Sequence, residues 1–171
     1  MKLDDNDFVL FGLPERFSLD RADLDARWRK LQASVHPDKF AADGAAAQRV
    51  AMQWAVRVNE AYRRLREPLM RAAYLCALRG APIDAHDNTA MPTDFLMQQM
   101  QWREALDDAR DDSAALGVLD EQVRGAEHAL LNEVGHLLDV AGDAPAAARH
   151  VRALMFIAKF RRDLADRLEL I

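Results

Sequence analysis

The sequence predicts an all-α protein, with a helical hairpin flanked by short helices and, behind it, an antiparallel three-helix bundle. Almost every long segment of the 171-residue chain places apolar residues three or four positions apart, which is the helical period. Alternating runs of β-branched residues are missing, and glycine occurs only seven times. Half of the residues are apolar, which is enough to bury a core without disulfides or metals.

The predicted hairpin follows a short apolar piece at residues 5–12, which ends at Gly12 and Pro14. Its first helix starts with Asp20 as N-cap, because an Asp side chain can accept hydrogen bonds from first-turn amides. The helix ends by His36, since Pro37 disfavours helical backbone at the preceding residue. Its apolar positions form one stripe: Leu24, Trp28, Leu31 and Val35.

A loop through Gly44 leads to the second helix, which is predicted from about Ala46 to Arg66. Pro68 breaks that helix, and a shorter helix follows. The core stripe of the second helix is predicted to contain Val50, Trp54, Val58, Ala61 and Leu65. Structural roles that tie the hairpin to the short helix are predicted for Asn59, Tyr62, Pro68 and Arg71.

Residues 79–92 form the best candidate linker, because this stretch combines Gly, two Pro, Asn and Asp. The predicted domains are therefore residues 1–78 and 93–171.

Three helical stretches follow the linker, and their short connections predict an up-down-up bundle. Thr93 or Asp94 is expected to cap the first and Ser113 the second, while Gly142 ends the second and Asp143 caps the third. The first carries Leu96, Met100, Arg103 and Leu106 on one line; the second Leu116, Leu119, Val123, Leu130, Val134 and Leu137; the third Val151, Leu154, Ala158, Phe160 or Arg161, Leu164 and Leu168.

Composition narrows the classes of function. The one cysteine, Cys76, lies in an apolar run and is interpreted as a small buried residue. No segment has a signal-peptide pattern or approaches the ~20 apolar residues of a membrane span, so we expect a cytoplasmic protein without a membrane partner. Residues 1–78 carry 13 Lys and Arg against 11 Asp and Glu, and residues 79–171 carry 10 against 17. This asymmetry indicates two surfaces with different partners, and no dense Lys/Arg block points to nucleic acid.

The loop motif His36-Pro37-Asp38 gains meaning from its context between two amphipathic helices. The second of these closes with Asn59-Glu60-Ala61-Tyr62-x-x-Leu65, followed by Pro68, Arg71 and Tyr74. This arrangement, over roughly residues 7–78, resembles a J-domain.

Further motifs resemble the HscB family, the J-domain co-chaperones of iron–sulfur cluster assembly. They are Phe11-Gly12-Leu13-Pro14, His36-Pro37-Asp38-Lys39-Phe40, Pro68-Leu69-Met70-Arg71-Ala72-x-Tyr74-Leu75 and Asp94-x-Leu96-Met97-x-x-Met100-x-x-Arg103-Glu104. The resemblance implies a protein without bond chemistry or cofactor of its own. It implies that the J-domain docks on an HscA-like chaperone of the DnaK class and stimulates its ATP hydrolysis, while the bundle holds an IscU-like scaffold protein.

Two sets of residues are predicted to carry these interactions. Asp38 offers a carboxylate for a bidentate arginine of the chaperone, Pro37 fixes the loop, and basic side chains steer an acidic surface. The predicted chaperone-binding residues are His36, Pro37, Asp38, Arg27, Arg29, Lys30 and Lys39. The positions that match the scaffold-binding residues of the family are Leu96, Met97, Met100, Gln101, Glu104 and Phe156. The family usually has Leu and then Glu where this chain has Met100 and Gln101. This chain therefore lacks the carboxylate for one charged contact with the scaffold.

Other interpretations are weaker. The histidines His36, His86, His128, His136 and His150 include no pair with the i,i+4 spacing of a zinc enzyme, so no metal is expected. His36 and Asp38 as a catalytic pair would need a nucleophile and a pocket that the sequence does not indicate. A J-domain protein of a general DnaK-type chaperone with other clients remains an alternative. A Gly/Phe-rich linker and Cys-x-x-Cys repeats, both expected of the DnaJ class, are missing. A purely structural interaction module is the last alternative, and a monomer is the simplest expectation.

Overall fold

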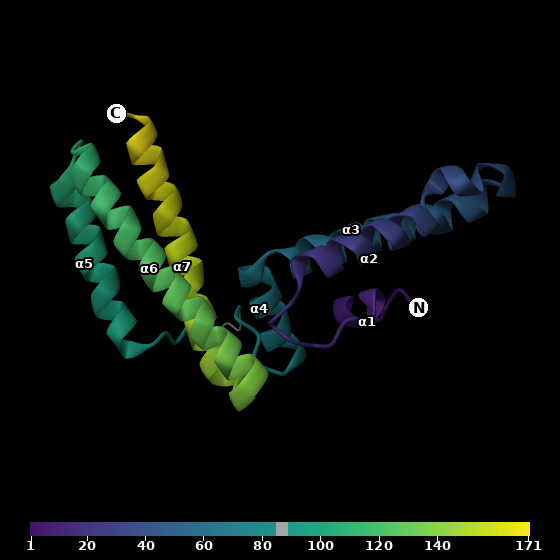
Figure 1. Cartoon of the computed structure of the whole chain (residues 1–171), viewed down its shortest axis with the longest axis horizontal. Coiled ribbons are helices and arrows are strands. Elements are labelled where there is room, and N and C mark those ends of the chain that lie inside the picture. Colours follow the sequence, from purple (N-terminus) through teal and green to yellow (C-terminus); the bar gives the residue numbers. More distant parts are fainter. Residues whose placement is uncertain (85–88) are drawn as a thin grey trace. The chain divides into compact units, whose positions relative to one another are not determined.

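The computed structural model describes residues 1–84 and 89–171, and within these ranges every regular element is helical (Figure 1). The chain divides into a first unit, residues 1–71, and a second unit, residues 72–171. The helical elements confirm the predicted all-α class. The division lies inside the helix Pro68–Leu78, whereas the sequence predicted domains that end at residue 78 and begin at residue 93. The predicted domain limits stay a prediction. The predicted linker includes residues 85–88, which lie outside the described residues.

The first unit is built on a hairpin of α2 (Arg21–Val35) and α3 (Ala45–Arg66), joined by a 3₁₀ turn, η1 (Pro37–Asp43). The short helix α1 (Asp7–Phe11) packs against both long helices. The predicted N-cap is confirmed, because the Asp20 carboxylate accepts from the amides of Ala22 and Asp23. The first unit therefore has the predicted form of a helical hairpin with short flanking helices.

Polar side chains lock the register of the hairpin. The indole Nε1 of Trp28 donates to Asn59 Oδ1 at 3.0 Å, and the Trp28 ring stacks on Tyr62 with 4.4 Å between centroids. The Tyr62 hydroxyl donates to Asp25 at 2.7 Å and, as the main cause, holds the pKa of that carboxyl below its usual value. Asn59 and Tyr62 are thus structural, as predicted, but they tie α3 to α2 rather than to α4.

One apolar position of α3 departs from the prediction. Val58, Ala61 and Leu65 are buried, as expected, but Val50 is 52% exposed, and Ala51 is buried in its place. The interpretation of Val50 as a core residue was wrong, because α2 ends at Val35 and the η1 turn that follows leaves Val50 on the wall of an open groove.

The helix α4 (Pro68–Leu78) begins in the first unit, where Arg71 holds it in place. Arg71 is 7% exposed and donates to the backbone carbonyls of Phe17 and Leu65 at 2.8 and 2.6 Å. Its guanidinium also lies 5.0 Å from the centre of the Phe17 ring. Arg71 therefore has the predicted structural role, joining α4 to α3 and to the segment before α2.

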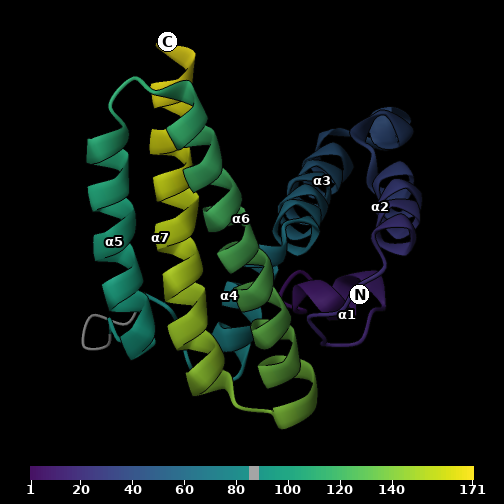
Figure 2. The ribbon, with the colours of Figure 1, turned by 60° about the vertical axis from the view of Figure 1, so that its left-hand side comes forward.

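The second unit is the predicted three-helix bundle, formed by α5 (Thr93–Ala109), α6 (Ser113–His136) and α7 (Ala144–Glu169). Figures 1 and 2 show the three helices side by side. A π-helical turn, η2 (Leu137–Ala141), extends α6 to Gly142, which adopts the left-handed conformation at φ 66° and ends the helix as predicted. Asp143 caps α7, also as predicted.

Two predicted caps were wrong. Asp112, not Ser113, accepts from the first-turn amides of α6, and α5 begins after Pro92 with no side-chain cap. Thr93 is already helical, so neither it nor Asp94 occupies the N-cap position. Both errors place a boundary one or two residues late, which is the usual uncertainty at helix ends.

The line of residues noted in the α5 sequence, Leu96, Met100, Arg103 and Leu106, is not the core face of the helix. Of its members only Leu106 is buried, whereas Leu96 and Met100 are 51% and 72% exposed. The buried residues of α5 are Phe95, Trp102 and Leu106. Phe95 and Trp102 pack edge to face at 5.8 Å, and Trp102 stacks on Phe160 at 6.0 Å. The core of the bundle is completed from α6 and α7 by Leu116, Leu119, Val123, Ala153, Ile157, Phe160 and Leu164.

The segment that enters the bundle is held by a buried cation. Arg152 of α7 is 7% exposed and donates to the carbonyls of Ile83 at 3.1 Å, Ala90 at 3.0 Å and Pro82 at 3.5 Å. Both described ends of the predicted linker are therefore anchored to α7. Cys76 is fully buried nearby in sequence, and burial raises the pKa of its thiol to about 11, as suits the predicted inert role.

Candidate protein-binding surfaces

The loop that carries His36, Pro37 and Asp38 is ordered by its own hydrogen bonds. His36 ends α2 with extended backbone, and its Nδ1 accepts from the amide of Asp38 at 3.2 Å. Because an N–H donates to Nδ1, the neutral ring carries its proton on Nε2. Pro37 then starts the 3₁₀ turn at a position where its missing N–H costs nothing.

The loop directs its carboxylate into solvent. The side chain of Asp38 is 93% exposed and that of His36 is 53% exposed. The Asp38 oxygen nearest to His36 Nδ1 lies at 3.6 Å, too far for a hydrogen bond, so the carboxylate keeps its acceptor sites for another molecule. A fixed, exposed carboxylate of this kind fits bidentate pairing with a guanidinium.

The four predicted basic residues do not have equal surroundings. Arg27 pairs with Asp23 at 3.0 Å and also donates to the carbonyls of Phe11 and Gly12 at 3.0 and 3.1 Å. It therefore fastens the end of α1 to α2. Arg29, Lys30 and Lys39 are exposed and make no hydrogen bond or ion pair within residues 1–84 and 89–171. These three are consequently better placed than Arg27 to meet an acidic partner.

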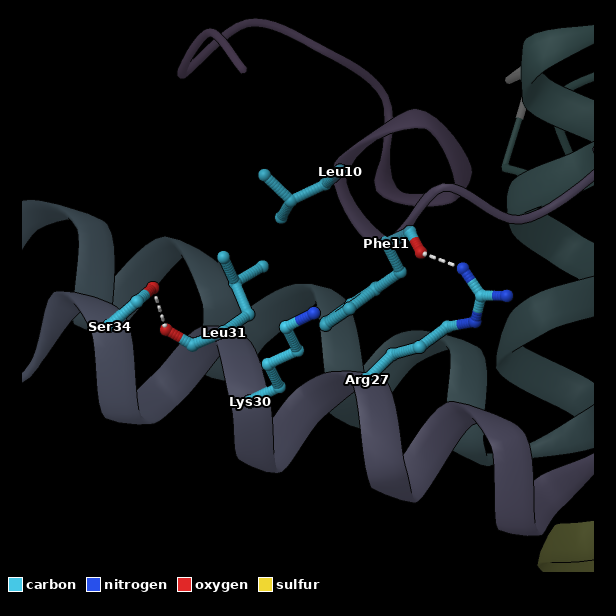
Figure 3. Close-up of a pocket in the computed structure, with 6 residues that line it drawn as sticks. All are labelled: Leu10, Phe11, Arg27, Lys30, Leu31 and Ser34. Atoms are coloured by element: carbon cyan, nitrogen blue, oxygen red, sulfur yellow. Dashed lines mark hydrogen bonds between the residues drawn. The ribbon is translucent and has the colours of Figure 1, made fainter.

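A groove of about 300 Å³ lies between α1 and α2, and both Arg27 and Lys30 line it (Figure 3). Its apolar wall comes from Leu10, Phe11 and Leu31, and Ser34 donates back to the Leu31 carbonyl at 2.7 Å. Figure 3 shows the Lys30 ammonium extending over the groove, beside Leu31 and Phe11. The basic face of α2 is thus continuous with a partly apolar surface.

The second candidate surface is the solvent face of α5. Leu96, Met97 and Met100 are 51%, 66% and 72% exposed, and Gln101 and Glu104 are exposed as well. Their spacing places them on the side of the helix opposite the buried Phe95, Trp102 and Leu106. Five of the six residues predicted to bind the scaffold therefore share one exposed, largely apolar helix face.

Phe156, the sixth, is half buried on α7. It packs edge to face on Phe95 at 5.7 Å, and the guanidinium of Arg103 lies 5.4 Å from its ring centre. Arg103 follows Met100 by three residues, so Phe156 lies at the border of the exposed α5 face. The structure places it as a core residue with one accessible side.

In the described part of the chain, no three His, Cys, Asp or Glu side chains gather closely enough to hold a metal ion. His86 lies outside the described residues, and His150 contacts the Ala146 carbonyl of its own helix at 2.9 Å. No helix within residues 1–84 and 89–171 has the length and apolar character needed to cross a membrane.

Comparison with known proteins decides the family. The co-chaperone protein HscB homolog of Bordetella petrii is 49% identical over 161 residues, which cover 94% of this chain and 95% of that protein. This chain belongs to the HscB family of co-chaperones. The HscB homolog of Burkholderia multivorans is 50% identical and covers 99% of this chain and 97% of its own length.

The second half matches a family model described as the HSCB C-terminal oligomerisation domain, over residues 91–165. The solved structure of the chaperone HscB from Vibrio cholerae is 36% identical, has a TM-score of 0.80, and covers 95% of this chain and 96% of its own. The predicted HscB resemblance is thus confirmed along nearly the whole chain, including the bundle helices for which the sequence offered pattern more than motif.

Sequence reasoning missed three residues that shape this HscB-family protein. Phe95 and Trp102 build the base beneath the exposed α5 face, and Arg152 anchors the segment that leads into it. Aromatic residues seven positions apart, in line with Leu106, were the available signal for the first two. No sequence pattern indicates that an arginine on a helix will be buried, because its partners are backbone carbonyls distant in sequence.

Proposed function

We propose that this HscB-family co-chaperone stimulates ATP hydrolysis by an HscA-like chaperone of the DnaK class and delivers an IscU-like iron–sulfur scaffold protein to it. The observation that carries the proposal is the pairing of two exposed surfaces in one chain. One is the ordered loop with the 93% exposed Asp38 carboxylate, and the other is the exposed apolar face of α5.

The loop acts on the chaperone by selective binding. His36, Pro37 and Asp38 dock on the hydrolysis-competent state more tightly than on the other state, which shifts the population toward hydrolysis. Asp38 receives a guanidinium of the chaperone, and Arg29, Lys30 and Lys39, together with Arg27, attract its acidic surface. The co-chaperone has no turnover of its own and needs no cofactor or metal in this role.

The α5 face binds the scaffold. Leu96, Met97 and Met100 supply adaptable apolar contacts, Gln101 and Glu104 supply polar ones, and Phe156 borders the face. Gln101 replaces the family's usual carboxylate, so any cation of the scaffold that faces this position meets a neutral amide. The arrangement explains why large apolar side chains stand in solvent opposite a well-filled core.

The chaperone surface is tested by Asp38→Asn, with Asp43→Asn in the same 3₁₀ turn as control. We expect Asp38→Asn to reduce stimulation of the HscA-like ATPase at least about tenfold, because a charge-assisted bidentate pair is lost. Asp43→Asn should stimulate like wild type. Equal stimulation by both variants and wild type would contradict the role of the loop. Stimulation of a general DnaK in preference to the HscA-like chaperone would instead change the partner.

The scaffold surface is tested by Met97→Asp, with Met52→Asp as control, because the two methionines are 66% and 59% exposed on different helices. Calorimetric titration with the IscU-like scaffold should show about tenfold or greater weakening for Met97→Asp and none for Met52→Asp. If both variants bind like wild type, the scaffold does not use this face of α5.

We further expect a monomer in the cytoplasm, although the matched family model carries oligomerisation in its description. Light scattering at several concentrations measures the mass directly. A mass of about 19.3 kDa is expected, and a stable dimer would overturn the monomer.

A further inference from the structure

An apolar groove of about 460 Å³ lies at the loop end of the α2–α3 hairpin. Its walls come from three elements: Val35 ends α2, Phe40 lies in η1, and Val50, Ala51 and Trp54 belong to α3, together with two alanines at the start of α3. Among residues 1–84 and 89–171, no charged side chain lines it. The groove lies where α2 has ended and η1 leads into the start of α3.

Val50 shows that the groove is open to solvent. Its side chain continues the apolar line of Val58, Ala61 and Leu65, yet it is 52% exposed while Val58 and Ala61 are fully buried. An apolar hollow that a chain keeps in contact with water is a typical binding surface for another protein.

The groove is continuous with the loop proposed to bind the chaperone. Val35 directly precedes His36, and Phe40 follows Asp38 by two residues in the same 3₁₀ turn. A chaperone whose arginine binds the Asp38 carboxylate therefore contacts this chain only two residues from Phe40 of the groove wall. Asp38 of the loop motif and Phe40 of the groove both lie in η1.

We propose that this groove receives a bulky apolar side chain of the same ATPase chaperone whose guanidinium pairs with Asp38. The inference rests on the proposed function and adds to it an apolar anchor beside the charged contact. Asp38 then fixes orientation, and burial of the chaperone's side chain against Val50 and Phe40 supplies affinity.

The test compares Val50→Asp with Val56→Asp, measuring the co-chaperone concentration that gives half-maximal stimulation of the HscA-like ATPase. The two valines lie on the same helix with exposures of 52% and 53%, and only Val50 lines the groove. We expect Val50→Asp to raise that concentration about tenfold or more and Val56→Asp to leave it unchanged.

A second pair guards against a folding defect. Ala46 and Ala45 are both exposed in the first turn of α3, where a carboxylate favours the helix, but only Ala46 lines the groove. Ala46→Glu should therefore weaken stimulation severalfold and Ala45→Glu should not. If wild type stimulates and His36→Gln does not, while both groove variants match wild type, the groove proposal fails and the proposed function stands. If wild type does not stimulate at all, both are overturned. A groove variant that changes the mass of the protein instead of its stimulation would show a second copy as the occupant, and this also overturns the proposal.

Discussion

At the scale of single residues, arginines with backbone partners hold this molecule together. Arg71 and Arg152 are each 7% exposed and donate to carbonyls of other segments, most of them more than 50 residues away in sequence. In each, the long apolar part of the side chain packs in the interior and the guanidinium donates hydrogen bonds to several carbonyls. Asp7, fully buried, is paired with Arg57 and Arg64 at 2.8 Å each.

Replacing Arg152 by methionine keeps the apolar volume but removes the donors to Ile83, Ala90 and Pro82. We expect the free energy of unfolding to fall by about 2 kcal/mol, because hydrogen bonds from a charged group are lost. Denaturant unfolding measures it, and Arg149→Met, at an exposed position of the same helix, is the control. An unchanged unfolding midpoint for Arg152→Met would show that the anchor contributes nothing to stability.

The Tyr62 hydroxyl stabilises the charged form of Asp25 and so lowers the pKa of that carboxyl. A depressed folded-state pKa contributes stability that is present above the unfolded pKa and is lost as pH falls through the folded one. Tyr62→Phe should therefore destabilise the first unit at pH 7. The difference from wild type should shrink once pH falls below the ordinary value of 3.8. Unfolding curves at both pH values check this, and a difference that grows in acid would contradict it.

At the scale of elements, the sequence predicts what local chemistry determines. Pro37 and Pro68 lie just after the ends of α2 and α3, and Asp20 and Asp143 cap helices through their own side chains. The register of α5 was not predictable in the same way. Its exposed face carries Leu96, Met97 and Met100, so apolar spacing alone cannot tell the core side from a binding side. The three residues were matched from the sequence to scaffold-binding positions, and they lie on this exposed face.

The cap of α6 gives a test with a matched control in neighbouring residues. Asp112 accepts from the amides of Ala114 and Ala115 at 3.0 and 3.2 Å, whereas Ser113 is the first helical residue. Asp112→Ala should cost about 1 kcal/mol of stability, and Ser113→Ala should cost little. Thermal unfolding compares the two, and a larger loss for Ser113→Ala would restore the serine as the cap.

At the scale of the whole molecule, charge divides between the two predicted functions. Residues 1–78 carry a slight excess of Lys and Arg, whereas residues 79–171 carry 17 Asp and Glu against 10 Lys and Arg. The charge division is a property of the sequence, and the sequence also predicted the two-part helical architecture and the HscB family. The buried arginine anchors and the open groove beside the loop needed the structure, because both depend on side chains that meet across long stretches of chain.

The acidic second part leads to a prediction for scaffold binding. If it meets a basic surface of the scaffold, affinity should weaken severalfold as salt rises from low to high ionic strength, because exposed charges are screened. Titrations at several salt concentrations measure this. An affinity that does not change with salt would show that the apolar α5 face acts without long-range attraction.

The measurement that tests the central claim most directly is steady-state ATP hydrolysis by the HscA-like chaperone. It compares wild type, His36→Gln and Met97→Ala, each with and without the IscU-like scaffold. Two separate surfaces predict that His36→Gln loses stimulation under both conditions, while Met97→Ala stimulates alone but loses the scaffold's added effect. Stimulation by His36→Gln equal to wild type would contradict the account, as would a full scaffold effect with Met97→Ala.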